Sequence, residues 1–141
     1  NDRWALLGTV GWENGSVFED VNISTERGSQ KIPRNWDDTW KFAGGVHFRP
    51  VDKWLLQLGF AYDTSPVSNN DRTADLPLDE QIRIAAAYGK ANPIGLSYSF
   101  STSYVYFGEG KMDQTAQGER FKGEFDTNYL VFIAASVNYR F

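Results

Sequence analysis

Few residues of this sequence could take part in catalysis or in metal binding. The chain has one histidine, His47, and no cysteine, so disulfides, thiolate chemistry and a His-rich metal site are excluded. His47 alternates with Lys41 and Arg49, and we interpret it as an ordinary residue of a polar strand face. Carboxylates also gather between residues 75 and 80, but their spacing matches no defined calcium motif, so we interpret them as a solvated loop. We therefore expect no enzyme active site, no metal and no cofactor.

Charge and hydropathy exclude two further classes of protein. The net charge is −4, from 14 basic and 18 acidic residues, and no basic run stands out, so nucleic acid is not an expected partner. No segment approaches the roughly 20 apolar residues that a membrane-spanning helix needs. The functional residues must therefore be sought on strands and in loops.

A two-residue period dominates the chain. Residues 94–107 read IGLSYSFSTSYVYF, in which apolar or aromatic residues alternate with glycine and serine. This pattern predicts an extended strand with two opposite faces. Similar alternation predicts further strands at 4–12, 40–49, 54–63, 81–89 and 128–141, with a weaker match at 17–25. We predict an all-β, antiparallel architecture of about seven strands, most of them near the 9–11 residues of a tilted membrane strand.

One face of these strands carries most of the bulky side chains. Aromatic residues make up 16% of the sequence, although the mean hydropathy is only −0.47. The two values agree if the apolar residues occupy one strand face and small or polar residues the other, as in a transmembrane β-barrel. The residues predicted to face lipid are Trp4, Trp12, Trp40, Phe42, Trp54, Leu56, Leu58, Phe60, Tyr62, Ile82, Ile84, Tyr88, Leu96, Tyr98, Phe100, Val131, Ile133, Val137 and Tyr139.

The links between strands alternate in length. Residues 13–16, 50–53 and 91–93 have the composition of tight turns, whereas 27–38, 64–80 and 108–127 are long and polar. Such alternation is typical of outer-membrane barrels, which have short periplasmic turns and long outer loops. Seven strands, however, would leave the first and last strands parallel, so they could not close an antiparallel barrel. Either the chain is part of a larger barrel, or a strand hidden in 111–125 completes a closed eight-stranded one.

The order of several short motifs resembles the C-terminal half of the FadL family. They are GVHFRPVDKW, YDTSPV, an R-x-x-x-L-P run followed by an acidic residue, the opening WALLGTVGWENGSVF and the closing VNYRF. The resemblance covers nearly the whole chain. It implies a protein of the Gram-negative outer membrane that passively transports long-chain fatty acids or other hydrophobic compounds. It also implies a barrel of 14 strands, in which 1–141 is a single segment and the N-terminal hatch and first barrel half come before it.

The resemblance directs attention to residues that could hold such a substrate. A fatty acid needs an apolar channel for its tail and a cation for its carboxylate. Leu130 and Phe132 fall on the otherwise polar strand face and could line the channel, while Lys31, Arg34 and Arg72 are candidate cations. The alternative is that these cations are ordinary loop charges or lipopolysaccharide contacts.

The chain end and its partners complete the expectations. Tyr139 and Phe141 resemble the outer-membrane sorting signal read by the barrel-assembly machinery. Expected partners are this machinery, outer-membrane lipid and lipopolysaccharide, a hydrophobic small molecule and the missing N-terminal half. Two other classes stay open, a small structural or adhesive outer-membrane barrel and a soluble lipocalin-like binder.

Overall fold

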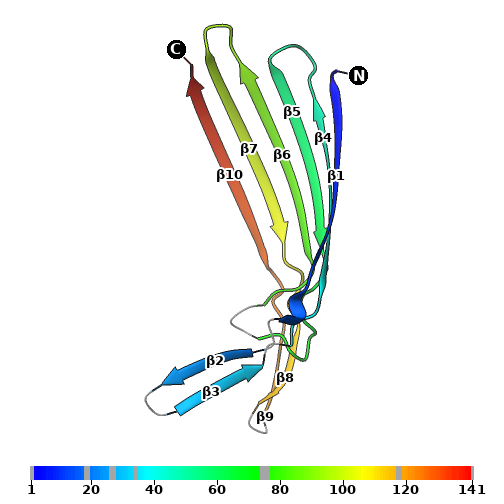
Figure 1. Cartoon of the computed structure of the whole chain (residues 1–141), viewed down its shortest axis with the longest axis vertical. Coiled ribbons are helices and arrows are strands. Elements are labelled where there is room, and N and C mark those ends of the chain that lie inside the picture. Colours follow the sequence, from blue (N-terminus) through cyan, green and yellow to red (C-terminus); the bar gives the residue numbers. More distant parts are fainter. Residues whose placement is uncertain are drawn as a thin grey trace.

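The computed structural model describes residues 2–17, 20–25, 28–33, 35–73, 77–116 and 119–140. Its main feature is one six-stranded antiparallel sheet, with the strands in the order β1-β4-β5-β6-β7-β10 (Figure 1). The strands are β1 (Trp4–Glu13), β4 (Thr39–Phe48), β5 (Trp54–Asp63), β6 (Gln81–Ala91), β7 (Leu96–Tyr106) and β10 (Tyr129–Tyr139). The all-β antiparallel prediction is therefore confirmed, and the 10–11 residues of each strand suit a tilted membrane crossing.

Two short hairpins stand apart from the main sheet. One joins β2 (Asp20–Thr25) to β3 (Gly28–Pro33), and the other joins β8 (Met112–Ala116) to β9 (Glu119–Gly123). A 3₁₀ turn, η1 (Gly15–Val17), follows β1. The predicted strand at 17–25 thus lies partly in β2 and outside the sheet, so the sheet has six strands where the alternation suggested seven. The suspected extra strand in 111–125 is the β8–β9 hairpin.

The pairing of β1 corrects the predicted strand directions. β1 pairs directly with β4 over ten residues, from Trp4 opposite Phe48 to Glu13 opposite Thr39. Glu13 therefore still belongs to β1, and residues 14–16 begin a long link and do not form a tight turn between sheet strands. Five antiparallel pairings join the six strands, and because five is odd, the first and last strands of the sheet run antiparallel to each other. The expected parallel arrangement was therefore wrong.

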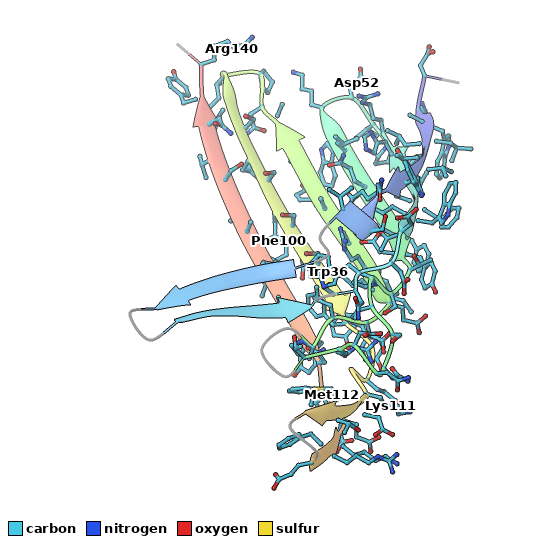
Figure 2. All side chains as sticks on the ribbon, turned by 60° about the horizontal axis from the view of Figure 1, so that its bottom comes forward. Trp36, Asp52, Phe100, Lys111, Met112 and Arg140 are labelled. Atoms are coloured by element: carbon cyan, nitrogen blue, oxygen red, sulfur yellow. The ribbon has the colours of Figure 1, made fainter. Side chains whose placement is uncertain are left out.

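The links separate cleanly by length. The short turns after β4 and β6 lie at the end of the sheet that also holds both termini, called the turn end (Figure 1). The long links 14–38, 64–80 and 107–128 lie at the opposite end, called the loop end. Asp52 and Arg140 mark the turn end and Lys111 and Met112 the loop end in Figure 2. The sheet is open, since β1 and β10 are not paired with each other, and this contradicts the closed eight-stranded alternative.

The register places every residue that was predicted to face lipid on the same face, called the aromatic face. Phe42 lies opposite Tyr62, Leu56 opposite Tyr88, and Tyr88 opposite Phe100. Aromatic side chains pair near both ends of this face: Trp4 stacks on Phe48 at the turn end with ring centroids 4.1 Å apart, and Tyr104 on Tyr129 at the loop end at 5.5 Å. Aliphatic residues between these bands are exposed, such as Leu58 at 60% and Ile133 at 69%. This banding is that of a membrane barrel exterior.

Candidate functional site: a hollow in the sheet and a cluster of loops

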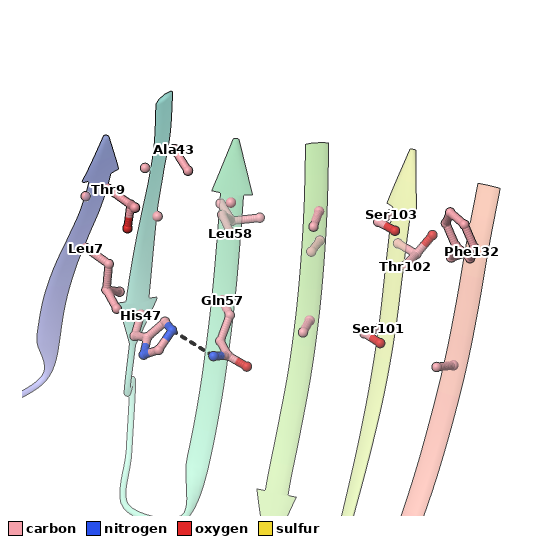
Figure 3. Close-up of a pocket in the computed structure, with 18 residues that line it drawn as sticks. Leu7, Thr9, Ala43, His47, Gln57, Leu58, Ser101, Thr102, Ser103 and Phe132 are labelled. Atoms are coloured by element: carbon pink, nitrogen blue, oxygen red, sulfur yellow. Dashed lines mark hydrogen bonds between the residues drawn. The ribbon is translucent and has the colours of Figure 1, made fainter. Parts of the chain in front are cut away.

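The opposite face of the sheet has an open hollow of about 490 Å³. All six strands contribute to its lining, which means that the sheet curves around it, and we call this side the hollow face (Figure 3). Its floor consists of very small residues, among them Ala43, Gly45, Gly59, Ala85 and Ala87. Because these side chains project so little, space remains above the strands. The volume lies within the range of small-molecule sites.

Both apolar and polar side chains line this hollow, and they come from different strands. Leu7 and Phe132 line it from the two edge strands, and Ser101 and Ser103 line it from β7. Leu130 lies on the same face but outside the hollow, opposite Val105 and nearer the loop end. The structure therefore brings Phe132 into the hollow, as the sequence pattern suggested, and places Leu130 on the route between the hollow and the loops.

One polar side-chain contact inside the hollow joins β4 and β5. Gln57 Nε2 lies 2.8 Å from His47 Nε2, and both side chains are half-buried. Figure 3 shows the two side chains pointing toward one another at the turn end of the hollow. The sequence analysis took His47 for a plain residue of the polar face. Its pairing could have been anticipated, because polar residues at positions 47 and 57 are cross-strand neighbours once the 50–53 turn fixes the register.

Two ion pairs occupy the loop end of the hollow face. Lys41 Nζ lies 2.6 Å from Glu13 Oε1, and the Arg83 guanidinium is paired with the Asp63 carboxylate. Asp63 is only 7% exposed. These four charges neutralise one another across neighbouring strands, so the loop end of this face carries charge in compensated pairs. The sequence analysis singled out none of them, although opposite charges at the ends of adjacent predicted strands were a usable signal.

Arg72 lies in the loop cluster and not in the hollow. Its side chain is 1% exposed. Nε donates to the carbonyl oxygen of Leu78 at 2.6 Å, Nη1 donates to Asn69 Oδ1 at 2.5 Å and to the carbonyl of Lys111, and Nη2 lies 3.0 Å from Asp79 Oδ1. Nη2 also donates to Ser65 Oγ and to the carbonyl oxygen of Val67. A guanidinium has five N–H groups, and this set of partners uses them within the protein. The geometry thus gives Arg72 a role in holding loops together. The sequence analysis had instead offered Arg72 as a cation for the carboxylate of a substrate.

Further hydrogen bonds join the three long links around Arg72, and we call this region the Arg72 cluster. Asn35 Nδ2 donates to Asp71 Oδ1 at 2.8 Å, which ties the first link to the second. The backbone N–H of Asp113 donates to the carbonyl of Asn69 at 2.9 Å and ties the third link to the second. Hydrogen bonds from Asn35 and then from Ser68 lower the pKa of the Asp71 carboxyl group, because they stabilise its charged form. The loop end is therefore one connected structure.

The other candidate residues are placed only in part. Lys31 belongs to β3, where its backbone pairs with Asn22. Arg34 and Phe141 lie outside the described residues, and the side chain of Lys31 is also outside this description. Tyr139 ends β10 opposite Leu96, on the aromatic face at the turn end. The substrate contact expected of Lys31 and Arg34 therefore stays a prediction.

The described residues hold neither a metal-binding cluster nor a membrane-spanning helix. Across 2–17, 20–25, 28–33, 35–73, 77–116 and 119–140, no three His, Cys, Asp or Glu residues gather in a way that could hold a metal ion. Within the same residues, no helix is both long and apolar enough to cross a membrane.

Comparison with known proteins now adds to this geometry. Residues 1–141 match the family described as "Outer membrane protein transport protein (OMPP1/FadL/TodX)". The chain belongs to the FadL family. This membership places it among outer-membrane proteins of bacteria, and it contradicts the soluble lipocalin-like alternative. The resemblance inferred from the short motifs is confirmed.

Individual relatives give the same result and show how much of the family fold this chain represents. It is 24% identical over 135 residues to the long-chain fatty acid transport proteins of Escherichia coli K12 and of Salmonella typhi, covering 90% of this chain and 30% of each relative. The crystal structure of a Pseudomonas aeruginosa FadL homologue matches with a TM-score of 0.86 and 25% identity, covering 99% of this chain and 33% of that one. The chain thus spans about 30% of the length of these relatives. The six-stranded sheet corresponds to part of a barrel of 14 strands.

Proposed function

We propose that this chain forms part of the wall of an outer-membrane barrel that passively transports long-chain fatty acids or other hydrophobic compounds. The observation that carries the proposal is the division of the sheet into two unlike faces. Exposed aromatic and aliphatic side chains cover one face, and a hollow of about 490 Å³ with a floor of glycine and alanine occupies the other. In this arrangement the aromatic face contacts lipid and the hollow is part of the channel.

The hollow suits a passing hydrocarbon chain for a simple reason. Its floor exposes few groups that a hydrocarbon would have to desolvate, because the strand backbone is already hydrogen-bonded in the sheet. Leu7 and Phe132 offer apolar contacts at its two sides. Transport then needs diffusion between weak apolar contacts and a conformational change in the hatch, with no nucleotide, metal or other cofactor.

The edges of the sheet indicate what else the transporter needs. β1 and β10 each have one side on which no described strand pairs. Unpaired backbone groups are not tolerated in the hydrocarbon layer, so we propose that the remaining barrel strands, together with an N-terminal hatch, lie outside residues 1–141. We further propose that the barrel-assembly machinery recognises Tyr139 and Phe141, and that the loop end meets lipopolysaccharide.

The transport proposal is tested by uptake. The full-length protein that contains this chain is expressed in a Gram-negative host that lacks its own fatty-acid transporter, and the initial rate of uptake of radiolabelled hexadecanoic acid and hexadecane is measured. We expect uptake of at least one probe above that of the empty host. Equal rates with and without a folded, surface-exposed protein would refute the proposal and would favour the adhesive alternative.

Lys31 and Arg34 enter as a separate proposal about capture of the carboxylate. We propose that these two cations attract anionic substrates to the loop end, and that the double variant Lys31→Gln, Arg34→Gln therefore lowers hexadecanoic acid uptake and leaves hexadecane uptake unchanged. The matched control is Arg49→Gln with Lys53→Gln, which removes two cations at the turn end. Unchanged acid uptake at normal expression would remove Lys31 and Arg34 from the substrate path.

A further inference from the structure

The polar pair in the hollow has hydrogen-bonding capacity that the protein does not use. Within the described part of the chain, the only hydrogen bond of the His47 and Gln57 side chains is the one between them. An amide nitrogen only donates, so His47 Nε2 accepts and the ring proton resides on Nδ1. This leaves the His47 Nδ1–H, the second Gln57 amide N–H and the Gln57 oxygen for another molecule.

The surroundings of this pair distinguish it from the other polar groups of the same face. The ion pairs of Lys41 with Glu13 and of Arg83 with Asp63 compensate their own charges. Ser99 and Ser136 form a 2.8 Å hydrogen bond with each other but do not line the hollow. His47 and Gln57 both line it, beside the small residues Gly45 and Ala87. A molecule in the hollow can therefore reach their free N–H donors at the turn end, in addition to the hydroxyl groups of Ser101 and Ser103 on β7.

We propose that His47 and Gln57 form a binding site for the polar head of a single-headed amphiphile, such as a carboxylic acid, whose apolar body lies along the glycine and alanine floor. This inference rests on the proposed transport function and adds to it the residues that would bind the head of an amphiphilic substrate. Each free N–H can donate one hydrogen bond to an oxygen of a carboxyl group, and because the two ring nitrogens of an imidazole point in different directions, one head uses one of these donors at a time. The body then extends toward Phe132, which lies in the loop half of the hollow (Figure 3). Pure hydrocarbons gain nothing from this pair, so the site makes the channel favour molecules with a head.

The test compares two probes whose apolar bodies have the same length. Uptake of hexadecanoic acid and of hexadecane is measured for the full-length protein, and the acid-to-alkane ratio of initial rates is the readout. The double variant His47→Leu, Gln57→Leu keeps side-chain bulk and removes both donors. Since a net hydrogen bond contributes about 1 kcal/mol, we expect the ratio to fall about fivefold.

A matched control shows whether the effect belongs to the site. Ser99→Ala with Ser136→Ala also removes an interstrand side-chain hydrogen bond from the same face, but outside the hollow. This variant should keep the wild-type ratio. Heat-dependent gel mobility confirms that each variant is a folded barrel. If the leucine variant does not fold, Gln57→Glu replaces it, because a carboxylate there repels an anionic head and should lower acid uptake alone.

The outcomes separate this inference from the transport proposal. An unchanged acid-to-alkane ratio in a folded leucine or glutamate variant overturns the head-group site, and so does an equal fall in both rates, which would indicate a purely structural pair. A wild-type protein that takes up neither probe refutes the transport proposal itself. A ratio that falls in the site variants and stays constant in the serine control establishes the site.

Discussion

The hollow and the Arg72 cluster lie in the same chain and are built in opposite ways. The hollow exists because its strands carry small side chains and make few side-chain bonds there. The Arg72 cluster is held by a buried guanidinium with partners in two of the long links. The sheet supplies rigidity to the hollow through its backbone, so the side chains are free to be small. The loops have no such ladder and must be fastened by side chains.

The largest effect is expected from breaking the cluster at its centre. Arg72→Met leaves the Asp79 carboxylate and several carbonyl groups without their donor, which we expect to cost about 3 kcal/mol of loop stability. Limited proteolysis of the full-length protein in its membrane should then cut the long links, while the barrel keeps its heat-dependent gel mobility.

The control for this variant is Arg120→Met, which removes an exposed cation paired with Asp113 in the β8–β9 hairpin. It should leave the proteolysis of the other links unchanged. Equal cleavage of both variants, or no cleavage of either, would contradict a central role for Arg72.

The second largest effect is expected from filling the hollow. Ala85→Phe places a ring over the floor, next to Gly59 and Ser103, and should reduce uptake of both probes several-fold with little change in barrel stability. Ala135→Phe makes the same change on the aromatic face, opposite Phe100, and should leave uptake unchanged. A loss of uptake in both variants would show that bulk anywhere in the sheet is harmful and that the hollow has no special part.

A smaller effect is expected from removing an apolar contact at the side of the hollow. Phe132→Ser removes the aromatic surface that β10 contributes to the hollow. Uptake of hexadecane and hexadecanoic acid should fall together, because both lose the same contact with the apolar body. Leu130→Ser, on the same face but outside the hollow, should have the weaker effect. If Leu130→Ser reduced uptake more than Phe132→Ser, the substrate path would lie nearer the loops than we propose.

The smallest effect is a pH dependence confined to the cluster. The pKa of Asp71 is lowered by its hydrogen bonds from Asn35 and Ser68, so its contribution to loop stability is complete above the ordinary value of 3.8. That contribution is lost as the pH falls from 3.8 through the lowered pKa. Proteolysis by an acid-stable protease should therefore increase in this range. Asp71→Asn should show a smaller change, and a pH response identical to wild type would exclude Asp71 as the cause.

The sequence predicted the sheet better than it predicted the loops, and the reason is physical. A two-residue period assigns each strand residue to a face, so Phe42, Leu58 and Phe100 could be placed together without coordinates. The same period could not show that 17–25 stands outside the sheet. The strand in this range, β2, pairs with β3, and strands of six residues are too short for a membrane crossing.

Arg72 illustrates the limit for the site. The residues around Arg72 in the sequence predicted a cation in a loop. The contact that defines its role, however, is with the carbonyl of Lys111, 39 residues along the chain. No local pattern encodes such a contact. His47 was recognised as a polar-face residue, and its bond to Gln57 followed from a register that a short turn fixes. Interactions across one hairpin were therefore predictable, whereas interactions between separate loops were not.

The two hairpins that project from the loop end have a consequence for how this surface can evolve. The described bonds of Arg72 go to residues within 65–79 and to Lys111, so none of them reaches the strands of the β2–β3 or the β8–β9 hairpin. We expect substitutions to accumulate in these two hairpins, while the base that Arg72 anchors changes slowly and keeps the shape of the entrance.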